Sequence, residues 1–248
     1  MLHSPPRFSV IVPAFNEERY LPRLLDSLDA ARRAYSGGRD AVEVIVADNA
    51  STDGTASVAL ARGCRVAPVP RRAIASARNG GARAANGSVL AFVDADTVRV
   101  HPRTFDAVDQ ALATGRYVGG ATGVRLERWS AGIAVTFALM VPLVWITGMD
   151  TGAVFCRRED FEAVGGYDEE RYFAEDVAFL AALRRLGRPR GQRLARLTDV
   201  KAVASTRKFD DHGDWHYLSW MPWALLAMLR DPTGKGPVVE RYWYRPGR

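Results

Sequence analysis

The chain has 248 residues, of which 48% are hydrophobic and 25% are charged, so it can bury one sizeable core. The formal net charge is +6, carried almost entirely by arginine, and this balance fits an anionic partner such as a nucleotide diphosphate or an acidic membrane surface. No basic run is interleaved with aromatic residues and no zinc-ligand spacing occurs, which argues against a nucleic-acid-binding protein.

The cysteines and the first residues bear on the compartment. Cys64 and Cys156 are too few and too far apart for a disulfide framework, which favours a reducing environment. Residues 1–7 do not resemble a signal peptide, because no apolar stretch follows a basic start. We therefore expect a cytoplasmic protein, either free or attached to the inner face of the membrane.

Strand and helix patterns alternate through the first 98 residues. Short apolar runs predict strands over 8–12, 42–47, 64–68 and 89–93. Amphipathic or small-residue segments predict helices over 19–33, after residue 55, and over 73–85. This alternation predicts an α/β fold with a parallel sheet, and such sheets bind ligands at the carboxyl ends of their strands. Polar residues follow three of these predicted strands, at 13–17, 48–55 and 94–96.

The second half is less regular. Its patterns predict helices over 102–113, 159–164 and 175–187 and strands over 117–124 and 152–156. The segment 129–149 has 21 residues without a charge, long enough to span a bilayer. A span would separate the polar residues at 94–96 from everything after Asp150. We therefore expect a buried or membrane-surface helix that breaks near Pro142.

Two carboxylates one residue apart, Asp94 and Asp96, follow the apolar run 88–93. Burying carboxylates is costly unless something compensates their charge. A divalent cation that bridges carboxylates and a diphosphate is a common answer, because hard oxygen ligands suit Mg²⁺ or Mn²⁺. Taken alone, such a pair at the end of a strand is more often a turn and a helix cap than a metal site.

Four sequence blocks in order carry a family resemblance. They are SVIVPAFNEE at 9–18, VADNASTDGT at 46–55, ARNG at 77–80 with FVDAD at 92–96, and Glu175-Asp176. Over roughly residues 8–188 the chain resembles family 2 glycosyltransferases of the GT-A type. The resemblance implies a GT-A-like α/β/α sandwich with a mostly parallel central sheet. It also implies one domain over 1–230, with a Rossmann-like nucleotide-sugar-binding half at 8–98 and an acceptor and catalytic half at 99–214, followed by an aromatic-rich segment at 215–248.

The resemblance further implies an inverting transfer of a sugar from a nucleotide diphosphate sugar to an acceptor hydroxyl, assisted by Mn²⁺ or Mg²⁺. Asp176 would be the catalytic base, with Glu175 beside it as the next candidate, and Asp96 would hold the metal. The donor-binding set would be Pro13, Ala14, Phe15, Glu17, Asp48, Arg78, Asn79, Asp94, Ala95 and Asp96. A UDP-sugar is favoured, a GDP-sugar comes next, and the acceptor is a glycan, a lipid-linked molecule or a small molecule.

The residues alone allow simpler interpretations. Asp176 fits an N-terminal helix charge, which the helix dipole would keep ionised, making it a weak base. Glu17 fits a first-turn charge and Arg78 a solvated helix residue. His212, in the polar run 205–215, is either a further metal ligand or part of a surface loop. Arg207 and Lys208 of the same run could clamp a diphosphate.

Other functions remain to be weighed. A sugar-nucleotide nucleotidyltransferase needs a Gly-rich basic loop after the first strand, where residues 13–18 are acidic and free of glycine. A nicotinamide dehydrogenase would need GxGxxG there. A non-catalytic sugar-nucleotide-binding protein would not need the carboxylates at 94, 96, 175 and 176. The apolar segment 215–229 predicts contact with a membrane surface, with a second copy of the chain, or with the core.

Overall fold

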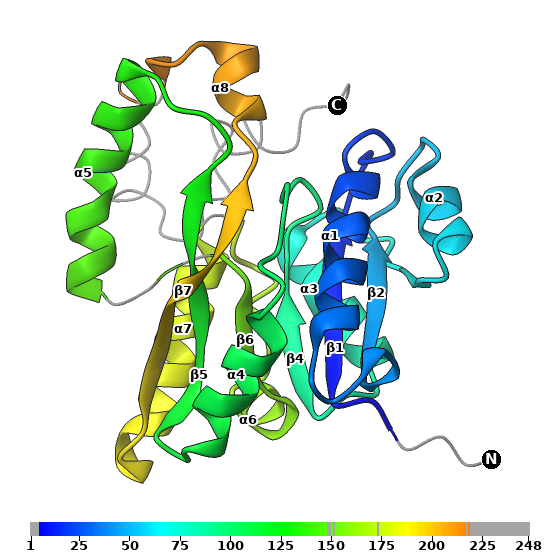
Figure 1. Cartoon of the computed structure of the whole chain (residues 1–248), viewed down its shortest axis with the longest axis vertical. Helices are drawn as coiled ribbons and strands as arrows, with labels where there is room; N and C mark the ends of the chain where they lie inside the picture. The colour runs from blue at the N-terminus through cyan, green and yellow to red at the C-terminus, as the bar shows by residue number, and fades with distance from the viewer. Residues whose placement is uncertain (1–4, 148–149, 151, 173, 217, 219–248) are drawn as a thin grey trace.

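The computed structural model describes residues 5–147, 150, 152–172, 174–216 and 218 (Figure 1). Its centre is a seven-stranded sheet in the order β3-β2-β1-β4-β6-β5-β7. The strands are β1 (Phe8–Ala14), β2 (Val42–Asp48), β3 (Arg65–Pro68), β4 (Val89–Phe92), β5 (Tyr117–Leu126), β6 (Val154–Arg157) and β7 (Arg193–Ala204).

Most neighbouring strands are parallel, as the alternating pattern predicts. β1 pairs in parallel with β2 and β4, β2 with β3, and β5 with β7. The exception is β6, which is antiparallel to both β4 and β5. Every residue of β1 is buried, which is expected of a central strand covered on both faces. The sheet takes strands from both halves of the chain, so both halves contribute to one scaffold.

Helices cover both faces of the sheet. The helices are α1 (Leu21–Ala34), α2 (Thr55–Ala61), α3 (Ile74–Ala84), α4 (Thr104–Ala113), α5 (Ala131–Thr147), α6 (Arg158–Ala163), α7 (Glu175–Gly187) and α8 (Arg207–His212). One hydrophobic cluster packs α1 and α4 on the sheet, and a second packs α3, α6 and α7 on the other face. In Figure 1, α1 and α4 lie in front of the sheet and α3 and α7 lie behind it. The α/β/α sandwich expected from the resemblance is confirmed.

Two features of the described chain differ from the prediction. The pattern predicts no strand over 193–204, yet β7 forms the edge of the sheet beside β5. The helix α5 continues through Pro142 to Thr147, so the expected break near Pro142 is wrong. In the described part of the chain, no helix combines the length and the hydrophobicity needed to cross a membrane. Most of the apolar segment 215–229 lies outside the described residues.

Candidate functional site

The candidate residues gather where the parallel strands end. Asp48 is the last residue of β2, while Asp94 and Asp96 follow the end of β4 directly in the chain. Pro13 and Ala14 close β1 and are buried, so they shape the floor of this edge rather than present side chains to solvent. The site therefore lies at the edge of the sheet where the topology of an α/β fold places ligands.

Strained backbone occurs at three points of this edge. Among the described non-glycine residues, those with a positive φ are Asn16 (53°), Ala50 (60°) and Ala174 (52°). Asn16 directly precedes Glu17, Ala50 closely follows Asp48, and Ala174 directly precedes Glu175. A left-handed conformation costs an L-residue with a Cβ free energy, and such residues cluster at functional sites. The strain marks the same loops that carry the candidate side chains.

The centre of the site is Arg78 on α3, whose side chain is 3% exposed. Its Nη2 donates to Oδ1 of Asp94 at 2.8 Å, and its Nη1 donates to Oε1 of Glu175 at 2.6 Å. The same Nη1 lies 2.6 Å from Oδ1 of Asp176. The guanidinium carbon also lies 5.0 Å from the ring centroid of Tyr167. Arg78 therefore joins the end of β4 to the start of α7, and its interpretation as a solvated helix residue is wrong.

The electrostatics of this cluster set the basicity of Asp176. Burial raises the pKa of Asp176 to about 7; the Arg78 guanidinium opposes this rise, and the carboxylates of Glu175 and Asp94 add to it. Burial thus makes Asp176 a stronger base than its interpretation as an ionised helix-start charge predicts. Burial likewise raises the pKa of Asp96, with Asp94 adding to the rise and nearby cations opposing it.

A second pair of charges joins opposite ends of the described chain. Arg207 on α8 donates through Nη1 and Nη2 to the two carboxylate oxygens of Glu17, each at 3.0 Å. Its Nη2 also lies 3.5 Å from Oδ2 of Asp96, and its guanidinium carbon lies 4.4 Å from the ring centroid of Tyr20. Lys208 acts on the carboxyl group of Asp96 electrostatically. The charges of Arg207 and Lys208, which we expect to bind a diphosphate, thus act beside Asp96, the carboxylate expected to hold the metal.

The carboxylates at the end of β4 fit a divalent metal that also binds substrate. Asp94 and Asp96 are partly exposed, with 46% and 32% of their side chains accessible. The described residues contain no cluster of three or more His, Cys, Asp or Glu side chains able to hold a metal by themselves. Mg²⁺ and Mn²⁺ beside nucleotides are commonly held by one or two carboxylates, with phosphate oxygens and water as the other ligands. The donor set suits that arrangement.

His212 lies at the far end of α8 and is exposed. Its Nδ1 is 3.1 Å from the carbonyl oxygen of Lys208, and its ring centroid is 5.2 Å from that of His216. Its role as a metal ligand stays a prediction.

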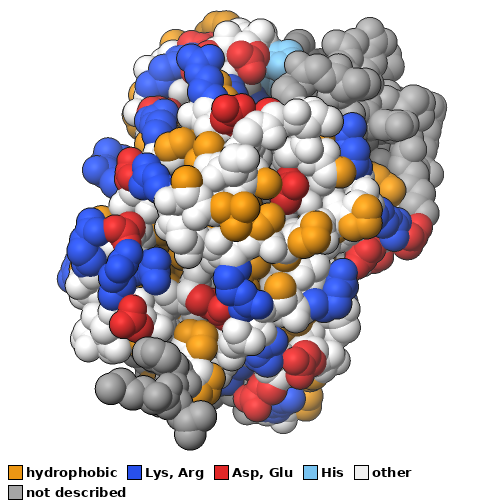
Figure 2. All heavy atoms as spheres, turned by 90° about the vertical axis from the view of Figure 1, so that its right-hand side faces the viewer, with side chains coloured by type: hydrophobic (Ala, Val, Ile, Leu, Met, Phe, Trp, Pro, Cys, Tyr) orange, Lys and Arg blue, Asp and Glu red, His pale blue; other side chains and the backbone are white. Residues whose placement is uncertain are grey.

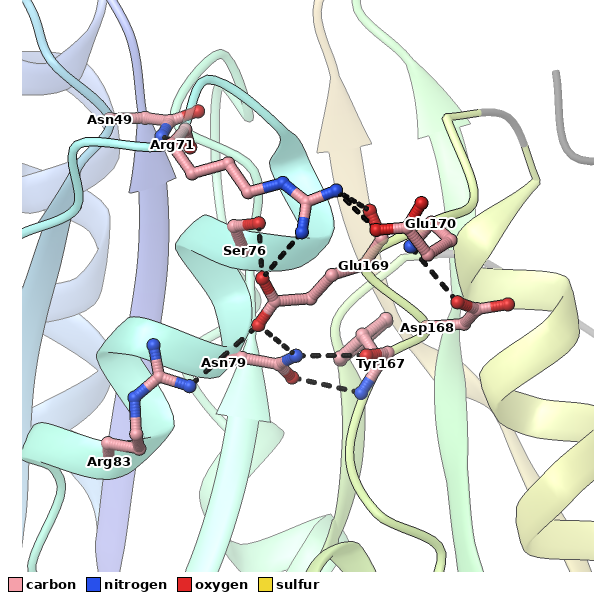
Figure 3. A network of polar contacts seen from close by, with 9 residues as sticks. All are labelled: Asn49, Arg71, Ser76, Asn79, Arg83, Tyr167, Asp168, Glu169 and Glu170. Atoms are coloured by element: carbon pink, nitrogen blue, oxygen red, sulfur yellow. Dashed lines mark hydrogen bonds and ion pairs between the residues drawn. The ribbon is translucent and has the colours of Figure 1, made fainter. Parts of the chain in front are cut away.

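Asn79, next to Arg78 on α3, is used inside the protein (Figure 3). Its Nδ2 donates to the carbonyl of Tyr167 and to Oε1 of Glu169, each at 2.9 Å. Its Oδ1 accepts from the backbone N–H of Tyr167, also at 2.9 Å. These contacts occupy its amide group. Asn79 therefore holds the segment that leads into α7, and its contact with the donor stays a prediction.

Glu169 is a residue that the sequence analysis missed. Its Oε2 accepts from Oγ of Ser76 at 2.6 Å, and Arg71 and Arg83 lie at ion-pair distances of 3.6 and 3.8 Å (Figure 3). Four side chains from α3 and the loop before it thus converge on one carboxylate of the segment before α7. Its only sequence signal was the turn at 165–168, which gave no reason to choose this carboxylate over its neighbours.

The remaining candidates line the same edge. Asp48 accepts from the backbone N–H of Ser51 at 3.2 Å, which closes the turn after β2, and its contact with a base stays a prediction. The guanidinium carbon of Arg72 lies 3.9 Å from the ring centroid of Phe15. An aromatic ring and a cation therefore stack between the loops after β1 and β3.

A mostly parallel sheet with helices on both faces, and carboxylates gathered where its strands end, make up a GT-A-like fold. Residues 9–129, just under half of the chain, match the family model described as Glycosyl transferase family 2, and this match, together with the relatives below, supports membership of that family. A glycosyltransferase of Mycobacterium tuberculosis is 39% identical over 88 residues, which make up 36% of this chain and 36% of the relative. The chain thus matches about a third of the length of this curated relative.

Solved structures share the fold. The mannosyltransferase of Pyrobaculum calidifontis, in complex with GDP-Man and Mn²⁺, superposes with a TM-score of 0.64 at 25% identity, covering 96% of this chain and 68% of that one. Residues 1–349 of S. aureus TarS, in complex with UDP-GlcNAc, superpose with a TM-score of 0.62 at 21% identity. That superposition covers 81% of this chain and 59% of TarS 1–349, and it bears on the fold alone.

Proposed function

We propose that the chain transfers a sugar from a nucleoside diphosphate sugar to an acceptor hydroxyl, with inversion at the anomeric carbon. The observation that carries the proposal is the Arg78 cluster, in which one buried guanidinium contacts Asp94 on the donor side and Glu175 and Asp176 at the start of α7. Arg78 thus contacts both a carboxylate that we expect to face the donor and the carboxylates that we expect to supply the base.

The proposed reaction is a single displacement. The acceptor oxygen attacks the anomeric carbon while the bond from that carbon to the diphosphate oxygen breaks, and the nucleoside diphosphate leaves with the electron pair. The acceptor proton passes to the carboxylate of Asp176. A pKa of about 7 suits this role, because a general base works best when its pKa lies near the working pH.

The donor side has to neutralise the leaving diphosphate. We assign Asp96, with Asp94, to holding Mn²⁺ or Mg²⁺, which would supply positive charge to the diphosphate oxygens. Arg207 lies 3.5 Å from Asp96 and adds a second cation at that point. Its bidentate contact with Glu17 fixes the guanidinium, so it does not have to be ordered when the donor binds. We expect Asp48 and Phe15 to border the base and ribose.

The nucleotide can be tested directly. We expect a UDP-sugar first and a GDP-sugar next, and the sugar-transferring relatives include a protein solved with GDP-Man and Mn²⁺. Calorimetric titration of UDP and GDP, with Mn²⁺ and with a chelator, should give tighter binding with the metal. The variant Asp96→Ala should lose the metal dependence and keep the fold. Equal binding with metal and with chelator would contradict metal assistance.

The catalytic base has its own test. Asp176→Asn keeps the shape of the side chain but removes the base, which typically costs about 10²–10⁴-fold in rate. Donor affinity should change little, because Asp48, Asp94 and Asp96 supply those contacts. If Asp176 only caps the helix, Asn serves nearly as well and the rate stays within a few-fold of wild type. In that case Glu175 becomes the next candidate for the base.

A further inference from the structure

A second cleft lies away from the Arg78 cluster. Its volume is about 530 Å³, and it is lined by Arg99, His101, Pro102, Arg125, Thr198, Asp199, Lys201 and Val203. His101 and Pro102 precede α4, a helix of the layer that covers the front of the sheet, whereas Arg78 belongs to α3 in the opposite layer. None of the lining residues has a part in the proposed transfer.

The backbone explains why the cations of this cleft share one face. Val203 of β7 pairs with Arg125 of β5 on one side and with Arg99 on the other. Paired residues on neighbouring strands point to the same face of a sheet, and residues two apart along a strand do so as well. Arg99 and Arg125 therefore project to the same side as Val203, and Lys201, from the irregular part of β7, lines the cleft beside them.

An irregularity in the sheet forms one wall of the cleft. Between Thr122 and Val124 the register of β5 with β7 shifts, so that Thr122 pairs with Leu197 and Val124 with Ala202. The extra residues of β7 bulge outward and carry Thr198, Asp199 and Lys201 to the cleft; bulges commonly re-aim side chains in this way. The stem of Lys201 lies so close to Gly123 that a Cβ there would come within 3.2 Å of Lys201 Cγ.

None of the three cations forms an ion pair with another described residue. Arg99, Arg125 and Lys201 are exposed, and none of the ion pairs or side-chain hydrogen bonds between described residues involves them. Asp199 is the one acidic residue that lines the cleft.

Many other arginines form ion pairs. On the face that carries α2 and the β3 edge of the sheet, basic and acidic side chains are interspersed (Figure 2). Asp26, Asp29 and Glu43 each form an ion pair with an arginine. Like charges on neighbouring strands repel, so a group of three unpaired cations costs free energy until an anion binds.

We propose that this cleft binds a phosphate group, carried either by a soluble phosphorylated molecule or by a lipid headgroup. Guanidinium groups donate paired hydrogen bonds to phosphate oxygens, and Lys201 and the hydroxyl of Thr198 add further donors. The proposal does not depend on the transfer reaction, because binding at this cleft is measured without turnover.

The test compares two variants that remove the same charge. The first is Arg99→Gln/Arg125→Gln/Lys201→Gln, which removes the cations of the cleft. The matched control is Arg116→Gln/Arg185→Gln/Arg188→Gln, which removes three exposed arginines for which the described chain likewise shows no ion pair. Each protein is titrated with inorganic phosphate and with phosphatidylcholine vesicles prepared with and without phosphatidylglycerol. Circular dichroism verifies that both variants fold.

We expect the cleft variant to lose at least about tenfold in affinity, because charge-assisted hydrogen bonds contribute about 1.5–3 kcal/mol each, and the control to stay within about twofold. Any phosphate bound at the donor edge is common to both variants and cancels in the comparison. Loss with free phosphate identifies a soluble ligand, and loss only with phosphatidylglycerol vesicles identifies a lipid headgroup. Equal affinity loss in the two variants, or no binding by the wild-type protein, would overturn the proposal.

Discussion

Replacing Arg78 by methionine tests how the site is held together. The guanidinium is almost fully buried and lies within 2.8 Å of carboxylate oxygens of Asp94, Glu175 and Asp176. Methionine fills much of the same volume but carries no charge, so three carboxylates would remain together without a cation. We expect the Arg78→Met variant to be less stable than the wild type. The loss of unfolding free energy should be largest at pH values at which those carboxylates are ionised.

The size of the expected stability loss follows from the burial of Arg78. Removing one partner of a buried ion pair typically costs about 3–5 kcal/mol, because the other charge is left uncompensated. Arg83 on the same helix provides the control, since its side chain is 69% exposed and its contact with Glu169 is 3.8 Å long. Arg83→Met should cost no more than about 1 kcal/mol, the range of surface ion pairs.

Urea unfolding at about pH 5 and about pH 8 measures both variants. Without Arg78 the folded carboxylates bind protons more tightly than the unfolded ones, so the stability of Arg78→Met must fall as pH rises. The gap from wild type should therefore be wider at about pH 8 than at about pH 5. The assignment of Arg78 fails if its variant costs no more than Arg83→Met at the higher pH.

Further outcomes follow from the same geometry. Because Asp176 must be deprotonated to act and burial raises its pKa to about 7, kcat/KM should rise with pH through about 7 and then level off; a pH profile that is flat through this range would exclude Asp176 as the base. Glu169→Gln should lower kcat more than it weakens donor binding, because Glu169 holds the segment before α7. Steady-state kinetics and donor titration measure the two effects separately, and an unchanged kcat would contradict this role. Ala174→Val should lose at least about 1–2 kcal/mol in urea unfolding, whereas Ala174→Gly should lose none, because only glycine adopts the left-handed conformation at no cost. Arg207→Gln should weaken donor binding by calorimetry about tenfold, and an unchanged Kd would remove Arg207 from the diphosphate site.

The first half of the fold could be predicted because its signals are local. The strands β1, β2 and β4 are predominantly apolar, and α1 repeats leucine at helical spacing, so local patterns identify them. The strand β7 could not be found in this way. It mixes buried and exposed residues irregularly and carries Arg193, Arg196 and Lys201, because one of its faces forms the second cleft and its register bulges.

The candidate site likewise contains residues that local sequence signals identify and residues that they do not. The carboxylates at 94, 96, 175 and 176 could be named from the sequence because short motifs carry them. The burial of Arg78 could not, because arginine in a helix of small residues is ordinarily solvated and no local pattern marks the exception. Glu17 and Arg207 lie 190 residues apart in the chain, and only the complete fold brings them together. Ion pairs between residues far apart in the chain are the feature of the site that a single sequence does not predict.

The contact between Glu17 and Arg207 also bears on how the protein is made. A ribosome completes β1 and the loop bearing Glu17 long before it adds the helix that supplies the partner arginine. Until residues 193–204 emerge, the ten-residue strand β5 remains an open edge, which is the kind of edge that pairs with foreign strands. The nascent chain therefore lacks the contact between Glu17 and Arg207 and exposes the edge of β5 in the same interval, and the synthesis of β7 and α8 ends both conditions.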